Sequence, residues 1–575
     1  MISIDVLIAG AGPVGLLLAH ELSQRGIKVI LAERNDGSTR HPKMDVTNPR
    51  SMEHFRRLGL AEELRAEGTP KENAFSVIWT EKLGGNPVAR FDYPSYEQAR
   101  VRLASINDGK GMAEPWLRIS QILLEPLLRK MLERDHPQTE VNFGLRLDSF
   151  VDHGNHVIST LTDLASGEQK QIRSLYLAGC DGAGSLVRKQ LGIEWNVMDT
   201  RTGPLNAVYR KFGFLAAARM ITGNLRHGPR NLWDGRMYLI NFRTKDVAFM
   251  QRNGTVWHEQ CALHGDTLIG QDDGELWTLH VALSPAMNAD HLDPKELLFQ
   301  RLGRKIDCEI LVANIWRPNL TVAKKFGRGR VWLIGDAAHQ VIPTGGYGMN
   351  TGVGDAVTSA WMLAASVQGW GGPGLLNGYE AERKPVIENN RRFSALHFGV
   401  RGMIIGHPNG DAAKLGKFIR KQGNLENELH GVELDYRYTQ SPLVVHESGR
   451  EPAWRPEAIT PSTWPGARLP HFWLEPDVAV FDKLGTGFTL VRLADMDVSG
   501  FAEAAEQMSI PFSLLDIRDP QIARVYERKL ILVRPDHHVA WRGDHVPTDA
   551  LEIFQRATGH RTWPDRRPAS AETPA

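Results

Sequence analysis

The sequence predicts an α/β protein built from several packed domains. Its 575 residues exceed what a single hydrophobic core usually supports. Hydrophobic residues make up 42% of the chain and charged residues 23%, which is the balance of a globular protein and argues against disorder, collagen-like repeats and coiled coils. The chain opens with an apolar strand, a glycine-rich turn and a helix, whereas its middle is rich in strand patterns.

The first turn carries the pattern of a dinucleotide-binding site. Residues 6–9 are continuously apolar and stop at a glycine, as in a buried parallel strand. Gly10, Gly12 and Gly15 follow, and apolar residues at helical spacing come next. In such a turn Gly10 permits the tight bend, Gly12 lets a pyrophosphate approach the backbone, and Gly15 allows the helix to pack on the strand. The predicted unit is therefore Rossmann-like, with phosphates at the helix N-terminus.

A second predicted strand, residues 27–32, leads to Glu33. This residue lies roughly 20 residues after the turn, where a carboxylate can accept hydrogen bonds from a ribose diol. Because strand, turn, helix, strand and acid come in this order, a glycine turn that binds nothing is the weaker interpretation. The motif alone does not separate NAD from FAD.

Two later segments indicate a flavin. One places Asp181 and Gly182 at the end of an apolar strand, before small residues and a basic helix start. Taken alone, that pattern also fits an ordinary turn with an N-cap aspartate. The other places Gly335 and Asp336 after an apolar strand, and a glycine-rich stretch at residues 343–352 follows. A plain NAD dehydrogenase has no need for this third element.

Together the three segments resemble the signatures of the class A flavoprotein monooxygenases, the FAD-dependent aromatic hydroxylases. The resemblance implies bound FAD, with Asp336 on its ribityl chain. It also implies that a loop containing Gly348, Met349 and Asn350 opens a helix near residue 355, whose amides face the flavin pyrimidine. The positive end of that helix would stabilise the anionic reduced flavin.

The resemblance assigns five more residues to the cofactor: Arg34, Lys43, Arg50, Gln121 and Asp181, the last of which would also serve NAD(P)H. Relatives usually carry arginine where this chain has Lys43, and the two cations differ in geometry and hydrogen-bonding reach. Gln121 matches a family glutamine that contacts FAD from a helix. A surface polar residue on an amphipathic helix would give the same pattern.

Asp45 is the first of two predicted catalytic residues. It lies in a segment, residues 42–53, that resembles the family segment beside the flavin ring, and an aspartate at this spacing is typical of the phenol hydroxylase and 3-hydroxybenzoate 4-hydroxylase branch. There a flavin C4a-hydroperoxide transfers oxygen to an electron-rich ring, so a carboxylate that draws the phenolic proton away is useful. A loop-capping aspartate is the alternative.

Tyr238 is the second predicted catalytic residue. Residues 237–242 and 276–283 look like strands of a sheet that resembles the substrate domain of the family, laid over the flavin. By that resemblance the Tyr238 hydroxyl would lie near a phenol. The alternative is a core position, since an aromatic residue in a strand usually packs in the core.

The predicted domain organisation has an FAD-binding domain split in two. Strand patterns near the end of the chain resemble the thioredoxin-like domain of the longer hydroxylases, but no cysteine follows Cys308, so dithiol exchange is excluded there and packing or subunit contact is expected. The predicted boundaries are 1–190 for the first FAD-binding part, with a substrate-domain excursion near 75–105, 191–313 for the substrate sheet, 314–446 for the second FAD-binding part with a helical linker, and 447–575 for the C-terminal domain.

Composition excludes several partners. Lys and Arg number 68 against 67 Asp and Glu, and this net charge of +1 lacks the positive field that nucleic acid binding needs. Cys180, Cys261 and Cys308 are too few and too scattered for a disulfide framework or a metal site, which favours a reducing compartment. No apolar run is long enough to span a bilayer, and the first residues carry no targeting pattern. We expect a cytoplasmic homodimer with neither nucleic acid nor membrane as partner.

The expected activity is the hydroxylation of a phenolic compound, ortho to its hydroxyl, with bound FAD, NAD(P)H and O2. One alternative is the polyketide and antibiotic branch of the same family, which oxygenates polycyclic substrates by hydroxylation or Baeyer-Villiger insertion. Another is a protein of the same fold that binds an aromatic ligand without oxygenating it.

Overall fold

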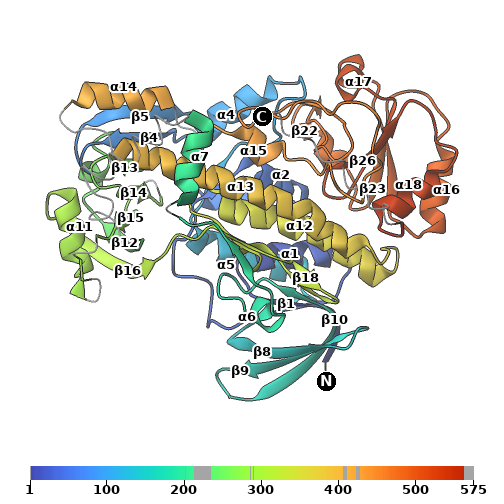
Figure 1. Cartoon of the computed structure of the whole chain (residues 1–575), viewed down its shortest axis with the longest axis horizontal. Helices are drawn as coiled ribbons and strands as arrows, with labels where there is room; N and C mark the ends of the chain where they lie inside the picture. Colours follow the sequence, from blue (N-terminus) through green and yellow to red (C-terminus); the bar gives the residue numbers. More distant parts are fainter. Residues whose placement is uncertain are drawn as a thin grey trace.

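The structure is a computed structural model that describes residues 2–200, 202–212, 235–272, 274–284, 287–288, 291–405, 411–422 and 428–561. Three large sheets organise this part of the chain, with eight, seven and four strands (Figure 1). In the described ranges no helix is both long enough and apolar enough to cross a membrane.

The N-terminal sheet has the order β18-β19-β10-β1-β2-β7, and its five strands from β19 to β7 are parallel. At one edge β18 pairs antiparallel with β19, while β9 joins β10 and β8 joins β9 in the same antiparallel sense. The strands are β1 (Ile2–Ala9), β2 (Val29–Glu33), β7 (Glu140–Phe143), β8 (Leu145–Asp152), β9 (Val157–Asp163), β10 (Gln169–Gly179), β18 (Gly327–Arg328) and β19 (Val331–Leu333).

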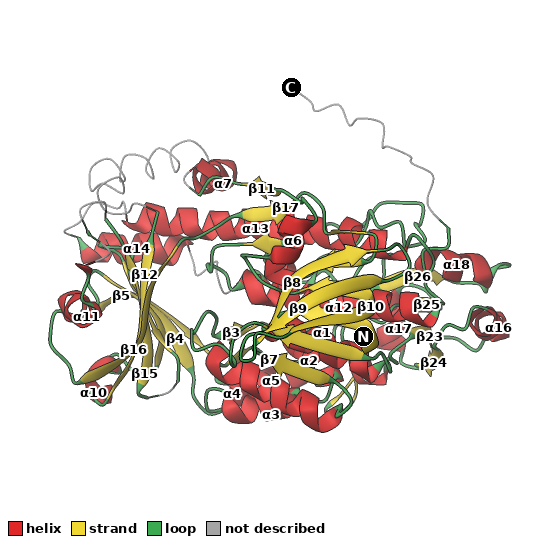
Figure 2. Ribbon diagram, turned by 90° about the horizontal axis from the view of Figure 1, so that it is seen from below, coloured by secondary structure: helices red, strands yellow, loops and turns green. Residues whose placement is uncertain are grey.

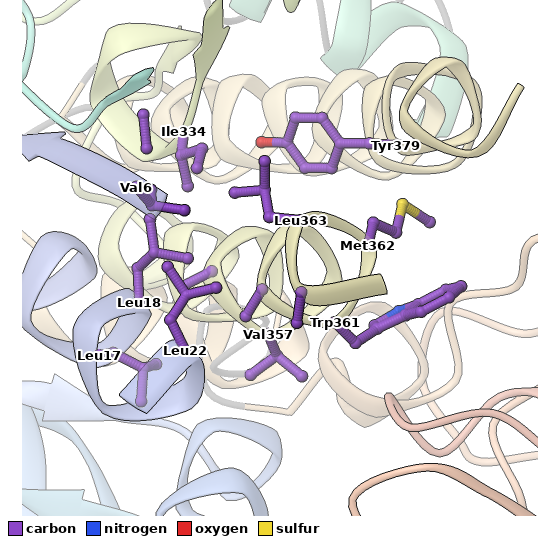
Figure 3. Close-up of a cluster of buried hydrophobic side chains, with 14 of the residues drawn as sticks. Val6, Leu17, Leu18, Leu22, Ile334, Val357, Trp361, Met362, Leu363 and Tyr379 are labelled. Carbon is purple, nitrogen blue, oxygen red and sulfur yellow. The ribbon is translucent and has the colours of Figure 1, made fainter. Parts of the chain in front are cut away.

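Four long helices accompany this sheet: α1 (Pro13–Gln24), α5 (Gln121–Asp135), α12 (Tyr347–Gln368) and α13 (Leu375–Ile405). Figure 3 shows the core where the first of them meets the third, with Leu18 and Leu22 of α1 facing Val357 of α12. Val6 of β1 closes this core, and all four side chains are buried. Apolar residues at helical spacing therefore build the scaffold that carries the glycine turn.

The start of α12 corrects one expectation. Residues 348–352 are not a loop before a helix near residue 355, because α12 already begins at Tyr347. Gly346, with φ of 64°, makes the left-handed turn just before it. A Cβ on Gly352 would lie 2.6 Å from the Val14 side chain, so the small residues of this segment let α12 pack closely against the start of α1.

The second sheet has the order β16-β12-β15-β14-β13-β4-β5 and is antiparallel except where β13 meets β4. One face packs against α11 (Pro294–Leu302) around Phe242 and Leu279. The other face is turned toward the loop at residues 41–45. The strands are β4 (Phe75–Thr80), β5 (Pro87–Tyr93), β12 (Met237–Thr244), β13 (Val256–Cys261), β14 (Thr267–Gly270), β15 (Leu276–Ala282) and β16 (Cys308–Trp316).

The C-terminal sheet has the order β24-β23-β25-β26, with β23 and β24 parallel and the other pairs antiparallel. Phe488 of β23 packs edge-on against Trp361 of α12, so this unit shares a core with the N-terminal sheet. Its elements are β23 (Phe488–Arg492), α16 (Ser499–Gln507), β24 (Phe512–Asp516), α17 (Pro520–Tyr526), β25 (Leu530–Val533), β26 (Val539–Gly543) and α18 (Ala550–Ala557).

The long helix α13 runs from the seven-stranded sheet toward the C-terminal unit (Figures 1 and 2). Arg401 near one end bonds Thr267 of β14, and Glu382 nearer the other end pairs with Arg534. Shorter elements connect these units: α2 (Pro49–Arg57), α3 (Ala61–Glu67), α4 (Tyr96–Ala104), α6 (Leu186–Gln190), α7 (Thr202–Phe212), α10 (Val247–Met250), α14 (Ala412–Gln422), α15 (His430–Leu434), β3 (Val46–Thr47), β6 (Leu117–Arg118), β11 (Trp195–Val197), β17 (Thr321–Ala323), β20 (His339–Gln340), β21 (Trp473–Glu475) and β22 (Val478–Ala479).

Candidate active site

The turn from β1 to α1 shows which of its glycines the backbone itself requires. Gly10 has φ of 108°, and a Cβ there would lie 2.3 Å from the carbonyl oxygen of Cys180. A Cβ on Gly15 would lie 2.0 Å from the carbonyl oxygen of Gly10. At Gly12 the nearest atom to a Cβ would be Glu125 Oε1, 4.0 Å away. Gly10 and Gly15 therefore allow close packing of the backbone. Gly12 leaves open space beside a helix N-terminus, which fits a pyrophosphate.

Glu33 closes the far side of this turn. Its Oε2 accepts the backbone N–H of Ala11 at 2.9 Å, and its Oε1 accepts the N–H of Asn35, also at 2.9 Å. Arg34, which lies between Glu33 and Asn35 in the sequence, is exposed. The carboxylate thus lies at the end of β2, beside the glycines, as a ribose-binding acid would.

Asp336, Lys43 and Gln121 border one space. The Asp336 side chain is accessible to solvent, but protein surrounds it on most sides. Desolvation by this protein raises the pKa of Asp336, while the charges of His339 and Lys43 oppose the shift. Lys43 also lowers the pKa of Glu125, which burial raises overall. Gln121 donates to Glu125 Oε1 at 2.6 Å. An accessible acid in a walled space, with a lysine and an amide beside it, fits a polar cofactor chain.

Two further groups face the same region. Asp181, directly after the Cys180 carbonyl that limits Gly10, accepts the N–H of Val187 through Oδ2 at 3.1 Å, and its buried Oδ1 has no hydrogen-bond partner in the described chain. The first turn of α12, with Gly348 and Met349, has neither an acidic side chain nor a capping side chain, so its free N–H groups keep their positive potential. Both features fit FAD.

Asn350 and Arg50, in contrast, make structural bonds. Asn350 donates to the Val46 carbonyl at 3.0 Å and accepts the Asn48 N–H at 2.9 Å, which fixes the segment around residue 46 against α12. Arg50 is buried, pairs with Glu53 at 3.0 Å, and donates to the carbonyl of Asp536 in the C-terminal unit at 2.9 Å. The structure thus brings Arg50 to the C-terminal unit rather than to the space beside Asp336.

Asp45 lies in the loop before β3, where that loop faces the seven-stranded sheet. Its Oδ2 accepts the indole N–H of Trp257 and lies 3.7 Å from His258 Nε2. Both of these residues belong to β13. Arg118 of β6 approaches the same oxygen at 4.0 Å. The backbone holds Asp45 in place as well, because its carbonyl accepts the Ile119 N–H at 3.0 Å.

The charges at this junction favour an ionised carboxylate. Burial by itself would raise the pKa of Asp45, but His258, Arg118 and Trp257 together hold that pKa below its usual value. Burial lowers the pKa of Arg118 to about 10, with Asp45 and Asp272 opposing the shift, so the guanidinium stays protonated at neutral pH. The site therefore holds a fixed negative charge.

Tyr238 lies on the other side of the sheet. It pairs with Val281, and both belong to the buried cluster that packs on α11. The neighbouring pair, Leu239 and His280, points to the opposite face, the one that also carries His258. The structure therefore does not bring Tyr238 together with Asp45, and its placement matches the core alternative.

Three residues that sequence reasoning missed complete the site: Arg118, Trp257 and His258. The last two are 212 and 213 positions beyond Asp45, in a strand whose pattern says nothing about its partner. Arg118 gave a weak signal, because it stands just before the helix that carries Gln121. Only the fold places these residues beside the carboxylate.

The comparisons with known proteins agree with this geometry. The chain matches the family profile described as FAD binding domain over residues 3–218 and 296–394, and the profile described as aromatic-ring hydroxylase, C-terminal, over residues 462–560. The first covers more than half of the chain. The protein therefore belongs to the FAD-dependent aromatic-ring hydroxylases, and it is a flavoprotein monooxygenase.

Relatives of similar length come from fungi and bacteria. The FAD-dependent monooxygenase apdD of Emericella nidulans is 32% identical, with 96% of this chain and 90% of that protein covered. Aklavinone 12-hydroxylase RdmE of Streptomyces purpurascens is 29% identical, with 96% and 97% covered. Phenol 2-monooxygenase of a Pseudomonas species is 26% identical, with 96% and 91% covered.

Solved structures give the same fold. RebC, a rebeccamycin biosynthetic enzyme solved with bound 7-carboxy-K252c, superposes with a TM-score of 0.81 at 30% identity, over 97% of this chain and all of that one. Aklavinone-11 hydroxylase in complex with FAD and aklavinone gives a TM-score of 0.77 at 26% identity, over 97% of this chain and 99% of that one. The mixed α/β fold is thus that of flavoprotein hydroxylases.

Proposed function

We propose that this enzyme hydroxylates a phenolic ring ortho to its hydroxyl, with NAD(P)H as reductant and O2 as oxidant. Bound FAD, held by the turn at Gly12, by Asp336 and by the start of α12, supplies the oxygen-transfer chemistry. The chain itself orients the ring, excludes water and manages the phenolic proton. Asp181 is the residue that we assign to both FAD and NAD(P)H.

The single observation that carries this proposal is the Asp45 carboxylate, whose Oδ2 faces Trp257, His258 and Arg118 at the seven-stranded sheet. A ring attacked by an electrophilic oxygen must be electron-rich, and a phenolate is richer than a phenol. A carboxylate at this junction favours that state by promoting loss of the phenolic proton, either directly or through a neighbouring base. A loop-capping aspartate would instead bond backbone N–H groups, whereas the partners of this carboxylate are side chains from β6 and β13.

A polycyclic substrate is the second candidate, and one observation favours it. Several buried polar atoms on the sheet face that carries His258 lack hydrogen-bond partners in the described chain. They extend over four strands from β14 to β16, roughly 14 Å at about 4.8 Å per strand, which is longer than a single ring requires. Two of the relatives reported above also carry the name of aklavinone. These atoms are Gln271 Oε1, His280 Nδ1, Asn241 Oδ1, Asn314 Oδ1 and Trp316 Nε1.

The finer description of the domains belongs to the same proposal. We assign a Rossmann-like topology to the parallel sheet and a thioredoxin-like one to β23–β26, with the boundaries near residues 190, 313 and 446. The C-terminal unit serves packing, because no cysteine follows Cys308. The enzyme acts as a cytoplasmic homodimer, which sedimentation would test.

A panel of phenols tests the reaction. The purified yellow holoenzyme is mixed with NADPH, or with NADH, and with phenol, resorcinol or the polycyclic alizarin under 18O2. We expect substrate-dependent NADPH loss and a product heavier by one labelled oxygen. Labelled product from alizarin alone favours the polycyclic candidate. Binding of these phenols without any labelled product would instead identify a non-oxygenating aromatic-binding protein.

A further inference from the structure

We propose that the imidazole of His258 accepts the phenolic proton and that Asp45 positions this imidazole. This inference rests on the proposed function, in that it takes the substrate to be a phenol. It adds a second residue to the site and gives the two residues different roles: the imidazole contacts the substrate hydroxyl, and the carboxylate holds the imidazole.

Among the described side chains that approach the Asp45 carboxylate, one can accept a proton. Trp257 offers only an indole N–H, and Arg118 offers only donors. Both already serve the site, since Trp257 bonds Asp45 and Arg118 donates to the Gly270 carbonyl and lies 5.0 Å above the Trp257 ring. The ring of His258 is the remaining group, and one of its nitrogens is an acceptor whenever it is neutral.

The two ring nitrogens of His258 face different surroundings. Nε2 is enclosed and points toward the carboxylate, 3.7 Å from Asp45 Oδ2. The side chain keeps 16% of its surface exposed, and Nδ1 is the nitrogen that is not enclosed. A carboxylate next to one nitrogen favours the proton there, which leaves the other nitrogen free as an acceptor, as in other carboxylate-histidine pairs. The ring of Trp257, 4.4 Å away by centroid, fixes the plane of the imidazole.

The other charged groups around His258 are compatible with this role. Asp45 Oδ2 lies 3.7 Å from His258 Nε2 and 4.0 Å from Arg118, so the imidazole and the guanidinium share one carboxylate oxygen. His280, on the same face of β15, is neutral at working pH because burial and the charge of His258 lower its pKa to about 4. Arg401 of α13 also lowers the pKa of His280, and Asp272 supports the charge of Arg118. An imidazolium at His258 therefore faces one carboxylate, which neutralises it.

The proposed step is a proton transfer and needs no other reactant. The O–H bond of the phenol breaks, and its proton forms a new N–H bond at His258 Nδ1. The electron pair stays on the oxygen, so the ring becomes a phenolate, and the imidazolium is balanced by Asp45. Without Asp45 the imidazolium would stand next to Arg118 alone, and without His258 the proton would have no acceptor in contact with the hydroxyl.

The test measures the ionisation of a bound phenol and needs no turnover. Oxidised FAD holoenzyme is titrated with 4-nitrophenol, and separately with alizarin, whose visible spectra change when they ionise. The apparent pKa of each bound probe is read from difference spectra as a function of pH. In the wild type we expect the ionisation constant of the bound probe to exceed that of the free probe by about tenfold or more, which is one pKa unit.

Three variants separate the roles. His258→Gln and Asp45→Asn should both return the ionisation constant of the bound probe to within about twofold of its free value, while FAD content stays stoichiometric. His291→Gln, an exposed histidine of the same region, is the matched control and should behave as the wild type. If His258→Gln loses FAD, His258→Asn replaces it. Should both variants lose FAD, the pH profile of the probe bound to the wild type decides instead. A profile in which one protein group titrates together with the probe supports the inference, and a profile with the probe alone overturns it.

Each outcome has one interpretation. A normal ionisation shift in His258→Gln together with its loss in Asp45→Asn would overturn the inference and make Asp45 the direct base, leaving the proposed function intact. A wild-type enzyme that binds neither probe, or that binds them without any shift, overturns both the inference and phenol recognition at this site. Loss of the shift in both variants supports the pair.

Discussion

At the scale of single residues, the decisive feature is a carboxylate whose charge the fold protects. Asp45 is nearly enclosed, yet its pKa is held low because a guanidinium, an indole N–H and an imidazole surround it. Such an arrangement costs desolvation, which only well-placed partners offset. A residue with a purely structural task would not need three partners from two distant segments.

Asp45→Asn should separate oxygen transfer from the other steps. We expect the variant to keep its FAD and to be reduced by NADPH, because the residue lies away from the glycine turn. Product formation should fall by about 100-fold to 10,000-fold, the usual range for general-base contributions, with hydrogen peroxide released instead. Raising the pH should partly restore product, since solvent then supplies the phenolate. The ratio of product to NADPH consumed measures this, and an unchanged ratio in a folded variant would return Asp45 to a structural role.

At the scale of elements, Gly10 and Gly12 in the turn between β1 and α1 differ in how closely other atoms surround them. Gly10 is needed by the chain, since a Cβ there meets the Cys180 carbonyl, whereas a Cβ on Gly12 would meet only Glu125, at 4.0 Å, among the described residues. The same motif therefore contains one position that serves folding and one that leaves space for the ligand we propose.

Gly12→Ala and Gly10→Ala should consequently fail in different ways. The Gly12→Ala apoprotein should have a free energy of unfolding close to that of the wild-type apoprotein. It should nevertheless bind FAD at least about tenfold more weakly, because the new methyl group occupies the phosphate position. Gly10→Ala should give little soluble protein, since a positive φ and a backbone clash combine. Flavin titration and urea unfolding of the apoproteins check this. Equal flavin affinity in Gly12→Ala and wild type would contradict the assignment.

Elements with local signals could be predicted from the sequence. The strand at residues 6–9 lies within β1, the one at 27–32 overlaps β2, and those at 237–242 and 276–283 correspond to β12 and β15. These segments owe their conformation to their own apolar pattern. The start of α12 was misplaced because glycines at 348 and 352 look like a loop, although close packing of Gly352 on Val14 favours a glycine there within a helix.

The site could be predicted only in part, because it depends on contacts between distant segments. Asp45 was proposed from its local segment, and its catalytic role stays a prediction. His258 was not, since its pairing with Asp45 is set by the way β13 faces the loop before β3. Tyr238 illustrates the same gap, because the register of β12 with β15 decides which face a side chain takes, and sequence patterning did not settle it.

At the scale of the whole molecule, buried charges join the C-terminal unit to the rest. Glu382 of α13 pairs with Arg534 at 2.7 Å, and Glu53 of α2 pairs with Arg468. All four side chains are almost fully buried. Such pairs specify how the units fit, because either partner alone is an uncompensated charge.

Arg534→Met should therefore destabilise the whole protein. Removing one partner of a buried pair typically costs about 3–5 kcal/mol, so the melting temperature should fall by several degrees while β23–β26 still forms. The double variant Glu382→Gln with Arg534→Met should recover only part of the loss, because Asp536, which also pairs with Arg534 at 2.7 Å, still lacks its partner. Differential scanning calorimetry with FAD present measures both, and a single variant as stable as the wild type would refute the coupling.

Stability should also fall in mild acid. Burial lowers the pKa of His471 to about 3 and the pKa values of His538 and His280 to about 4, whereas unfolded histidines titrate near 6.5. Below pH 6.5 the unfolded state thus binds more protons, and each histidine costs about 1.4 kcal/mol per pH unit. Asp266, whose pKa burial raises to about 6, acts in the opposite sense below that pH.

Urea unfolding at pH 7.5 and pH 5.5 measures this dependence. The free energy of unfolding should be lower at the acidic pH. His471→Phe should make its dependence on pH less steep by the contribution of one histidine, about 1.4 kcal/mol per pH unit. His291→Gln, which changes an exposed histidine, should leave the slope unchanged. Equal stability at the two pH values would contradict the burial of these imidazoles in a neutral form.

The helix α13 has a practical consequence for anyone who recombines members of this family. It is one unbroken element from Leu375 to Ile405, with the sheet contact of Arg401 toward one end and the buried Glu382 toward the other. A chimera that exchanges only the C-terminal unit would leave Glu382 and Glu53 facing foreign side chains. Exchanges that respect the chemistry must therefore carry both halves of each charge pair, and the seam between the two parents should not fall within this helix.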